Sequence, residues 1–149
     1  MVTSILEKGG CNTDEAEIVA DHLVLSNLNG HDSHGVGMLP VYIRMLKANL
    51  LKPNQNPKLF KKEGSIMMFD GNRGFGQAVG KIAMEKAIKK CKTKGLVLMT
   101  IRNVHHLGRI GTYGEQSITA GLISLHFVNV TDHPPVVCPH RGSDARFNT

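Results

Sequence analysis

The sequence has few of the features that define special classes of protein. It contains no tryptophan, two tyrosines and five phenylalanines in 149 residues, and this shortage of aromatic rings disfavours a single-strand nucleic-acid platform, where bases stack on exposed rings. Its three cysteines, Cys11, Cys91 and Cys138, are widely spaced and form no CxxC pair, which argues against a disulfide framework and a thiolate zinc site. Because the apolar runs are far shorter than a membrane span and no signal peptide is recognisable, we expect a cytoplasmic protein without membrane association.

The composition that remains is that of a globular protein about one domain long. Hydrophobic residues make up 41% and charged residues 20% of the chain, which excludes collagen-like, coiled-coil and wholly disordered classes. Eighteen basic against twelve acidic residues leave a net charge of +6, and this balance favours an anionic partner, either nucleic acid or a small acidic substrate. The lysines of 81–94 lie largely opposite an apolar stripe and predict a solvated helix face rather than a phosphate site.

The expected elements place helices first and then alternate strands with helices. This order predicts a mixed α/β or α+β fold with a mostly covered sheet. The expected elements are helices over about 14–28 and from 37–39 onward, a loop or linker over 52–64, a strand over 65–70, a glycine-rich turn over 71–76, a helix over 76–93, a buried-type strand over 96–101, a loop over 103–108, a helix over 110–120 and a strand over 122–130.

Histidines are the most informative candidates for chemistry. His31 and His34 lie in the polar turn GHDSHG, and His105 and His106 lie in NVHHLGR, directly after a strand, where open α/β sheets place ligands. The pKa of histidine near neutrality suits proton transfer. A metal site is the less favoured alternative, since HExxH is absent and few carboxylates accompany the histidines.

The run GNRGFGQAVG at 71–80 follows an expected strand and opens an expected helix. That context is required of a dinucleotide fingerprint, but the spacing is GxGxxxG and no acidic residue ends the next strand. The pattern therefore favours a tight turn with close helix packing over a phosphate-binding loop.

Four segments together carry a resemblance to a known family. They are GHDSHGVGMLPVYIRML, DGNRGFGQAVG, IRNVHHLGRIGTYGEQSITAGLISLHFVNV and CPHRGSDARFNT, in this order. Over about residues 5–149 the chain resembles the type 2 malate/L-lactate dehydrogenases, which are NAD(P)-dependent oxidoreductases with ureidoglycolate, sulfolactate and diketogulonate dehydrogenases among them. The SHGVGMLPVY segment is most similar to the hydroxycarboxylate dehydrogenase subgroup.

The resemblance implies a fold, a reaction and a set of partners. It implies a helical N-terminal portion followed by a non-Rossmann NAD(P)-binding domain of the sulfolactate dehydrogenase-like type. It also implies hydride transfer between NAD or NADP and a small anionic 2-hydroxy or 2-keto acid. A homodimer is expected, with no bound metal, no nucleic acid and no membrane.

Matching the motifs residue by residue implies the site. His106 and His34 fall on proposed acid–base histidines of the family, and His34 also lies at the cofactor. Gly108, Arg109 and Ile110 match a segment that contacts the cofactor, and Asn129 matches a polar position near the nicotinamide.

The sequence departs from the family pattern at three places. Met38 stands where many members carry an arginine that binds the substrate carboxylate, and Arg44 is a candidate substitute. The segment usually written NSxHFG is Asn-Val-His-His-Leu-Gly over 103–108, and Arg141-Gly142 replaces a glycine pair.

The late motif stops at Phe147-Asn148-Thr149, where relatives continue for about another domain or more. We therefore expect an N-terminal fragment, with a helical portion at residues 1–60 and the first part of the nicotinamide domain at 61–149, and we expect the fragment alone to be inactive. The alternatives are a non-catalytic binding or interaction fragment and, less favoured, a metal-dependent hydrolase built on the histidines.

Overall fold

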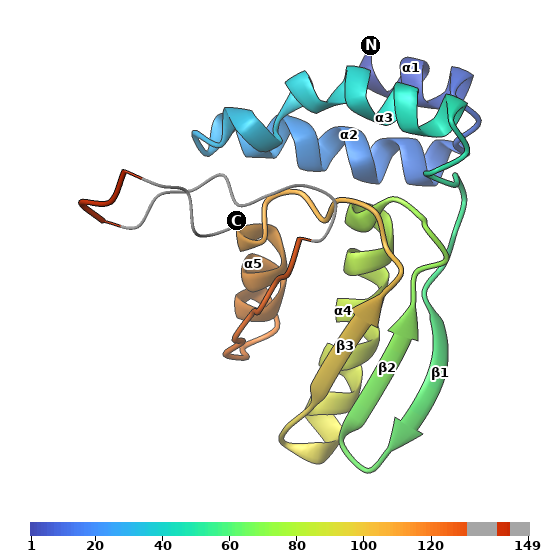
Figure 1. Cartoon of the computed structure of the whole chain (residues 1–149). Helices are drawn as coiled ribbons and strands as arrows, with labels where there is room; N and C mark the ends of the chain where they lie inside the picture. The colour runs from blue at the N-terminus through green and yellow to red at the C-terminus, as the bar shows by residue number, and fades with distance from the viewer. Residues whose placement is uncertain (131–139, 144–149) are drawn as a thin grey trace.

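The computed structural model describes residues 1–130 and 140–143 (Figure 1). Cys138 and most of the last matching segment therefore lie outside the described residues. The described elements are α1 (Val2–Lys8), α2 (Thr13–Leu28), the 3-10 turns η1 (Asp32–His34) and η2 (Val36–Met38), α3 (Leu39–Lys47), β1 (Lys58–Glu63), β2 (Ile66–Asp70), α4 (Gly76–Lys94), β3 (Leu98–Arg102) and α5 (Gly111–Thr119).

The first three helices form a layer across one end of the molecule, above the sheet and α4 in Figure 1. The amide oxygen of Asn12 accepts a hydrogen bond of 2.8 Å from the backbone N–H of Glu15 and caps α2, as N-cap asparagines commonly do. The stripe expected over 14–28 is buried, and Val19 and Leu23 pack with Leu39 of α3 and Phe75 before α4. This core joins the helical layer to the beginning of α4. The short helix α1 was missed because it has no strong apolar period.

The three strands make one sheet in the order β1-β2-β3. β1 runs antiparallel to β2, and β2 runs parallel to β3 in the register Phe69 to Ile101. Helix α4 connects the two parallel strands and packs on one face of the sheet, where Met67 and Phe69 contact Ala83. The predicted α/β class is therefore confirmed, with a strand–helix–strand unit at its centre.

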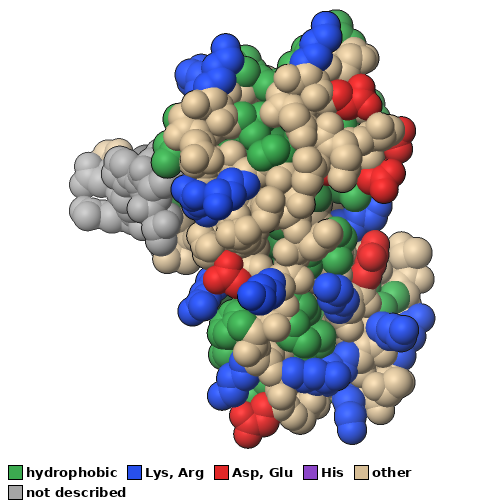
Figure 2. All heavy atoms as spheres, turned by 90° about the vertical axis from the view of Figure 1, so that its right-hand side faces the viewer, with side chains coloured by type: hydrophobic (Ala, Val, Ile, Leu, Met, Phe, Trp, Pro, Cys, Tyr) green, Lys and Arg blue, Asp and Glu red, His purple; other side chains and the backbone are tan. Residues whose placement is uncertain are grey.

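The prediction of a loop over 52–64 is wrong for its second half, where β1 forms. Every side chain of β1 is exposed, so the strand lacks the alternation of apolar and polar residues that reveals a half-buried strand. Figure 2 shows Lys and Arg side chains gathered over the lower part of this side of the molecule, and Lys58, Lys61 and Lys62 lie on β1. Lysines on an edge strand disfavour pairing with another chain.

Two further strand predictions need correction. The segment 96–101 was expected to be fully buried, but β3 is an edge strand of the described sheet, and its side chains alternate between exposed and half-buried because α4 covers one face. The segment 122–130 was expected to be a strand, yet it has no regular structure. Its alternating apolar residues Ile123, Leu125 and Phe127 are exposed, and the segment does not pair with the described sheet.

The glycine-rich turn before α4 allows close packing, as the sequence predicted. A Cβ on Gly76 would collide with the carbonyl oxygens of His105 and His106, and a Cβ on Gly80 would lie 2.7 Å from the ring of Tyr113. The glycines thus let the loop after β3 and the helix α5 approach the first turns of α4. The predicted solvated face is confirmed for Lys81, Lys86 and Lys89, which are exposed, whereas Lys90 is half-buried.

Candidate active site

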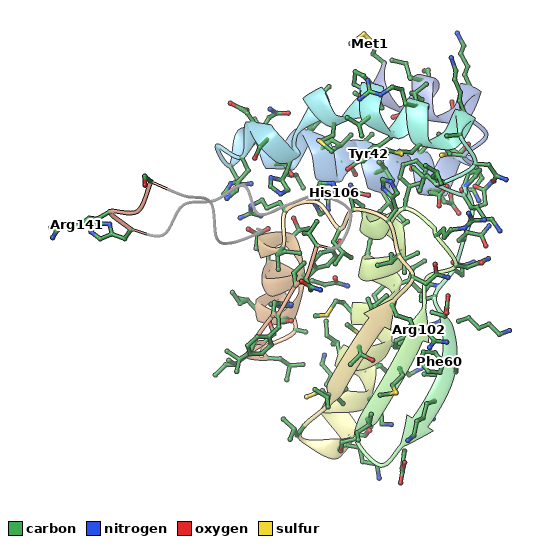
Figure 3. All side chains as sticks on the ribbon, viewed as in Figure 1. Met1, Tyr42, Phe60, Arg102, His106 and Arg141 are labelled. Carbon is green, nitrogen blue, oxygen red and sulfur yellow. The ribbon has the colours of Figure 1, made fainter. Side chains whose placement is uncertain are left out.

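The structure brings the two predicted catalytic histidines together. His34 lies in η1 and His106 lies in the loop after β3, yet their ring centroids are 5.2 Å apart and their planes differ by 30°. Both residues are half-buried, and His106 lies between the helical layer and the first turns of α4 (Figure 3). Two segments far apart in sequence therefore converge at the carboxyl end of β3.

Backbone hydrogen bonds to the glycine-rich turn hold the His106 loop. The N–H of His105 donates to the carbonyl oxygen of Gly74 over 3.0 Å, and the N–H of Arg73 donates to the carbonyl oxygen of Asn103 over 2.7 Å. The loop therefore lies directly on the turn, in the space that Gly76 leaves open. The position of His106 follows from this contact as well as from β3.

Asp70 at the end of β2 ties the same loop to the sheet. Its carboxylate accepts hydrogen bonds of 2.9 Å from the Asn72 N–H and the Asn103 amide, and one of 3.1 Å from Nε of Arg102. These bonds, the one from the Asn72 backbone first, hold the pKa of Asp70 below its usual value, because they stabilise the charged form. The carboxylate thereby joins the ends of β2 and β3 below the histidines.

His34 is held in its turn by its own neighbours. Its Nδ1 lies 2.8 Å from Oγ of Ser33, and the amide oxygen of Asn27 accepts a 2.8 Å hydrogen bond from the N–H of Val36 just beyond the turn. Partial burial, and then the nearby His31, lower the pKa of His34. Both effects favour the neutral imidazole, which can accept or donate a hydrogen bond.

Two residues that the sequence analysis did not select complete the surroundings of His106. The hydroxyl oxygen of Tyr42, on α3, lies 2.8 Å from Nδ1 of His106, and Nε2 of Gln77, on α4, donates to the same hydroxyl over 2.6 Å. Tyr42 is fully buried, and burial raises its pKa to about 12. Tyr42 lies on the apolar stripe of a helix, and Gln77 lies near the start of a helix. Neither position has a sequence signal that indicates function.

The guanidinium of Arg109 has one nitrogen that is paired with a carboxylate and two that are not hydrogen-bonded to the described residues. Its Nη2 donates to Glu115 over 2.6 Å, whereas its Nε and Nη1 are buried without a hydrogen-bond partner among the described residues, as is Oγ1 of Thr112. A Cβ on Gly111 would lie 2.9 Å from Cζ of Arg109, which places the guanidinium over the N-terminus of α5. Free donors at a helix N-terminus suit a phosphate or carboxylate group.

The backbone before α5 is held by a buried histidine that the sequence analysis also missed. Gly108 has a φ of +72°, and a Cβ there would collide with the ring of His22. Nε2 of His22 accepts a 2.9 Å hydrogen bond from the backbone N–H of Arg109. Gly108, Arg109 and Ile110 thus form a fixed connection between the His106 loop and α5.

Asn129 lines a cavity that the histidine pair does not line. It lines a cavity of about 530 Å³ at the carboxyl end of β3, together with His105, Asn103, Arg102 and Arg73. Neither His34 nor His106 lines this cavity. The predicted cofactor residue Asn129 therefore lines a different space from the one between the two histidines.

The structure does not place Arg44 as a substitute for the missing arginine at position 38. Met38 packs against the helical core, and Arg44 is exposed, two positions after Tyr42 on α3. Residues two apart on a helix point to nearly opposite sides, so Arg44 lies away from the His106 side. At the position where Arg141-Gly142 replaces a glycine pair, Arg141 adopts a φ of +61°. This is the left-handed conformation that a glycine takes more readily.

The described part of the chain contains no group of three or more His, Cys, Asp or Glu side chains arranged to hold a metal ion. The metal-dependent alternative therefore gains no support from these residues. Among the same residues, no helix is both long and apolar enough to cross a bilayer.

Comparison with known proteins agrees with the resemblance of the motifs. The family model described as malate/L-lactate dehydrogenase matches residues 1–149. The chain belongs to this family. It is 41% identical over 148 residues to hydroxycarboxylate dehydrogenase B of Escherichia coli K12. This alignment covers 99% of this chain and 41% of the relative. It is 43% identical over 136 residues to an L-lactate dehydrogenase of Cupriavidus necator, covering 91% of this chain and 39% of that protein.

Solved structures of the family have the same fold. An Escherichia coli structure of the malate/lactate dehydrogenase type superposes with a TM-score of 0.90 at 41% identity, covering 99% of this chain and 41% of that one. The sulfolactate dehydrogenase of Methanocaldococcus jannaschii gives a TM-score of 0.76 at 39% identity, covering 79% of this chain and 34% of that one. The chain thus spans about two fifths of the length of the curated relatives that it matches.

Proposed function

We propose that the chain supplies the proton-transfer part of an NAD(P)-dependent dehydrogenase that acts on small 2-hydroxy or 2-keto acids. The observation that carries this proposal is the convergence of His34 and His106, whose ring centroids lie 5.2 Å apart, in a chain of the malate/L-lactate dehydrogenase family. Relatives named as lactate and sulfolactate dehydrogenases support the substrate class.

The reaction divides between cofactor and protein. A bound nicotinamide supplies or accepts the hydride at C2 of the acid. His106 would donate a proton to the ketone oxygen during reduction and remove it from the hydroxyl during oxidation, a role worth roughly 10²–10⁴-fold in rate. His34, across the same space, would orient the substrate or exchange the proton with His106.

The described residues fit an anionic cofactor on one side of the histidines. The buried nitrogens of Arg109 without partners and the N-terminus of α5 would hold a phosphate of NAD or NADP, and the connection formed by Gly108 and Ile110 would lie against it. Asn129 lines the cavity at the carboxyl end of β3, which His106 does not line. To contact the nicotinamide, Asn129 would have to move from this cavity toward His106.

The substrate carboxylate must be held by a residue other than Met38 or Arg44, because Met38 packs against the helical core and Arg44 is exposed away from the His106 side. The net charge of +6 attracts an anionic acid only weakly and at long range. We further propose that the protein is a homodimer in the cytoplasm. We also propose a helical portion at residues 1–60 and the start of the nicotinamide domain at 61–149. The strand β1 crosses the boundary between these two parts.

The test is His106→Asn in the complete enzyme. We expect kcat to fall by roughly 10²–10⁴-fold while the circular dichroism spectrum is kept. The control is His126→Asn, which alters an exposed histidine whose described partner is Ser124. Turnover close to wild type in His106→Asn would reject the role of His106.

A further inference from the structure

We infer that Asn27 is a positioning residue for His34, because its amide bonds to both sides of the GHDSHG turn and holds the His34 ring opposite His106. The inference rests on the proposed function, in which His34 orients the acid, and deepens it by naming what fixes that histidine. Asn27 lies in the last turn of α2, and His34 lies in η1, the turn that follows.

The amide of Asn27 makes one hydrogen bond on each side of His34. Its Nδ2 donates to the carboxylate of Asp32 over 2.5 Å, and its Oδ1 accepts from the backbone N–H of Val36 over 2.8 Å. These partners fix the orientation of the amide, because an ionised carboxylate only accepts hydrogen bonds and a backbone N–H only donates them. His34 lies between the two bonded residues, so a change at Asn27 displaces the segment that carries the ring.

Gly35 allows the turn to close over this amide. The glycine is buried, and a Cβ at its position would collide with Oδ1, Cγ and Nδ2 of Asn27. Its φ of −88° lies outside the left-handed region that favours glycine. The side chain is therefore absent to make room for the amide, and Asn27 contacts the residue that directly follows His34.

Backbone hydrogen bonds fix the beginning of the turn on α2. The N–H of His31 donates to the carbonyl oxygen of Ser26 over 2.8 Å, and the N–H of Gly30 donates to the carbonyl oxygen of Asn27 over 2.9 Å. In the described part of the chain, the side chain of Asn27 provides the hydrogen bonds between α2 and residues 32–36. The place of the second half of the turn on α2 therefore depends on this one amide.

An amide at position 27 satisfies both partners, whereas a carboxylate would satisfy one. Asn27→Asp can still accept the N–H of Val36, but it has no hydrogen to donate to Asp32 and places a like charge beside that carboxylate. The pair can be restored with its polarity reversed, since an amide at position 32 can donate to a carboxylate at position 27. The double variant Asn27→Asp/Asp32→Asn also has the net charge of the wild type.

The kinetic test uses the single and the double variant of the complete enzyme. Asn27→Asp should raise KM for the acid by about tenfold, the effect of losing one hydrogen bond to a charged group, with a smaller change in kcat. The double variant should bring KM back close to the wild-type value. A loss of folded enzyme would instead lower the apparent kcat and leave KM unchanged. That pattern, or a double variant no better than the single one, would overturn the inference.

A second variant covers the case in which Asn27→Asp does not fold. Gly35→Ala keeps both hydrogen-bonding partners but pushes a methyl group into the Asn27 amide, so it should also raise KM for the acid. Gly37→Ala is the matched control, because a Cβ there meets nothing within 4 Å, and it should keep the wild-type KM and kcat. Equal KM values in the two alanine variants would contradict the inference.

The place of the His34 ring can also be measured without turnover. In the protein labelled with ¹³C-histidine, and with His34→Gln used to assign the signal, Asn27→Asp should shift the ring resonance of His34 and the double variant should return it. The resonance of the exposed His126 should stay in place. A His34 resonance unchanged by Asn27→Asp would overturn the inference. If it shifts and returns as expected but His34→Gln keeps a normal KM, the proposed role of His34 fails while the positioning by Asn27 holds.

Discussion

The backbone N–H of Arg109 donates a 2.9 Å hydrogen bond to Nε2 of His22, a histidine 87 positions earlier in the chain. The bond ties the connection between the His106 loop and α5 to the middle of α2. It requires a neutral His22, because an imidazolium has no acceptor nitrogen. Burial, and then the positive charge of Arg109, lower the pKa of His22 to about 4.

This buried histidine predicts a loss of stability in mild acid. Between pH 6.5 and about 4 the unfolded chain binds a proton at His22 that the folded chain does not, so the free energy of unfolding falls as the pH falls. From this group alone we expect a loss of about 3 kcal/mol from pH 7 to pH 4. Urea denaturation at a series of pH values measures it.

The comparison variant is His22→Gln, whose amide oxygen can accept the Arg109 hydrogen bond but does not titrate. Its stability should depend less on pH in this interval than that of the wild type. His126→Gln, at an exposed site, should keep the pH dependence of the wild type. Equal pH dependence in the wild type and His22→Gln would show that the buried ring is not responsible.

The two histidines of the pair should differ in their kinetic roles. If His34 orients the acid and His106 transfers the proton, His34→Gln raises KM for the acid more than it lowers kcat, and His106→Asn does the reverse. Steady-state kinetics of both variants in the complete enzyme decide between the roles. An exchanged pattern would assign the proton transfer to His34.

Arg109 is expected to bind the anionic part of the cofactor. Arg109→Met removes the buried nitrogens that have no described partner and keeps much of the side-chain volume. It should weaken NADH or NADPH binding to the complete enzyme by about 10- to 100-fold, which corresponds to one lost hydrogen bond to a charged group. Titration by nicotinamide fluorescence measures the Kd.

Glu115→Gln provides the control for Arg109. It removes the charge that pairs with Nη2 but leaves the guanidinium at the N-terminus of α5, so cofactor affinity should be kept or should rise. A Kd unaffected by Arg109→Met would place the cofactor phosphates elsewhere. For the 149-residue chain by itself we expect weak or no cofactor binding.

The contact of the His106 loop with α4 predicts a contrast between two glycines. Gly76→Ala places a methyl group against the carbonyl oxygens of His105 and His106 and should cost about 1–3 kcal/mol, as overpacking usually does. Gly114→Ala in α5, where a Cβ meets nothing within 4 Å, should stabilise the helix by about 0.5–1 kcal/mol. Equal effects in urea denaturation would contradict the close approach at Gly76.

Much of the fold was predictable because its signals are local. The apolar period of α2, the proline in the first turn of α3, and the glycine after α4 each determine a neighbouring stretch of backbone. The errors arose where an element depends on a partner. β1 carries no alternation and all its side chains are exposed, and the segment 122–130 has strand-like alternation but is not paired with the described sheet.

The sequence by itself determined the candidate chemistry, since the order and spacing of the GHDSHG, NVHHLGR and glycine-rich segments identified the family and selected His34, His106 and Arg109. Only the tertiary structure decided which side chains form hydrogen bonds with these residues. Tyr42 reaches His106 across 64 positions, and His22 reaches Arg109 across 87. A hydrogen bond between distant segments exists only once packing has placed both groups within about 3 Å, and no local pattern records it.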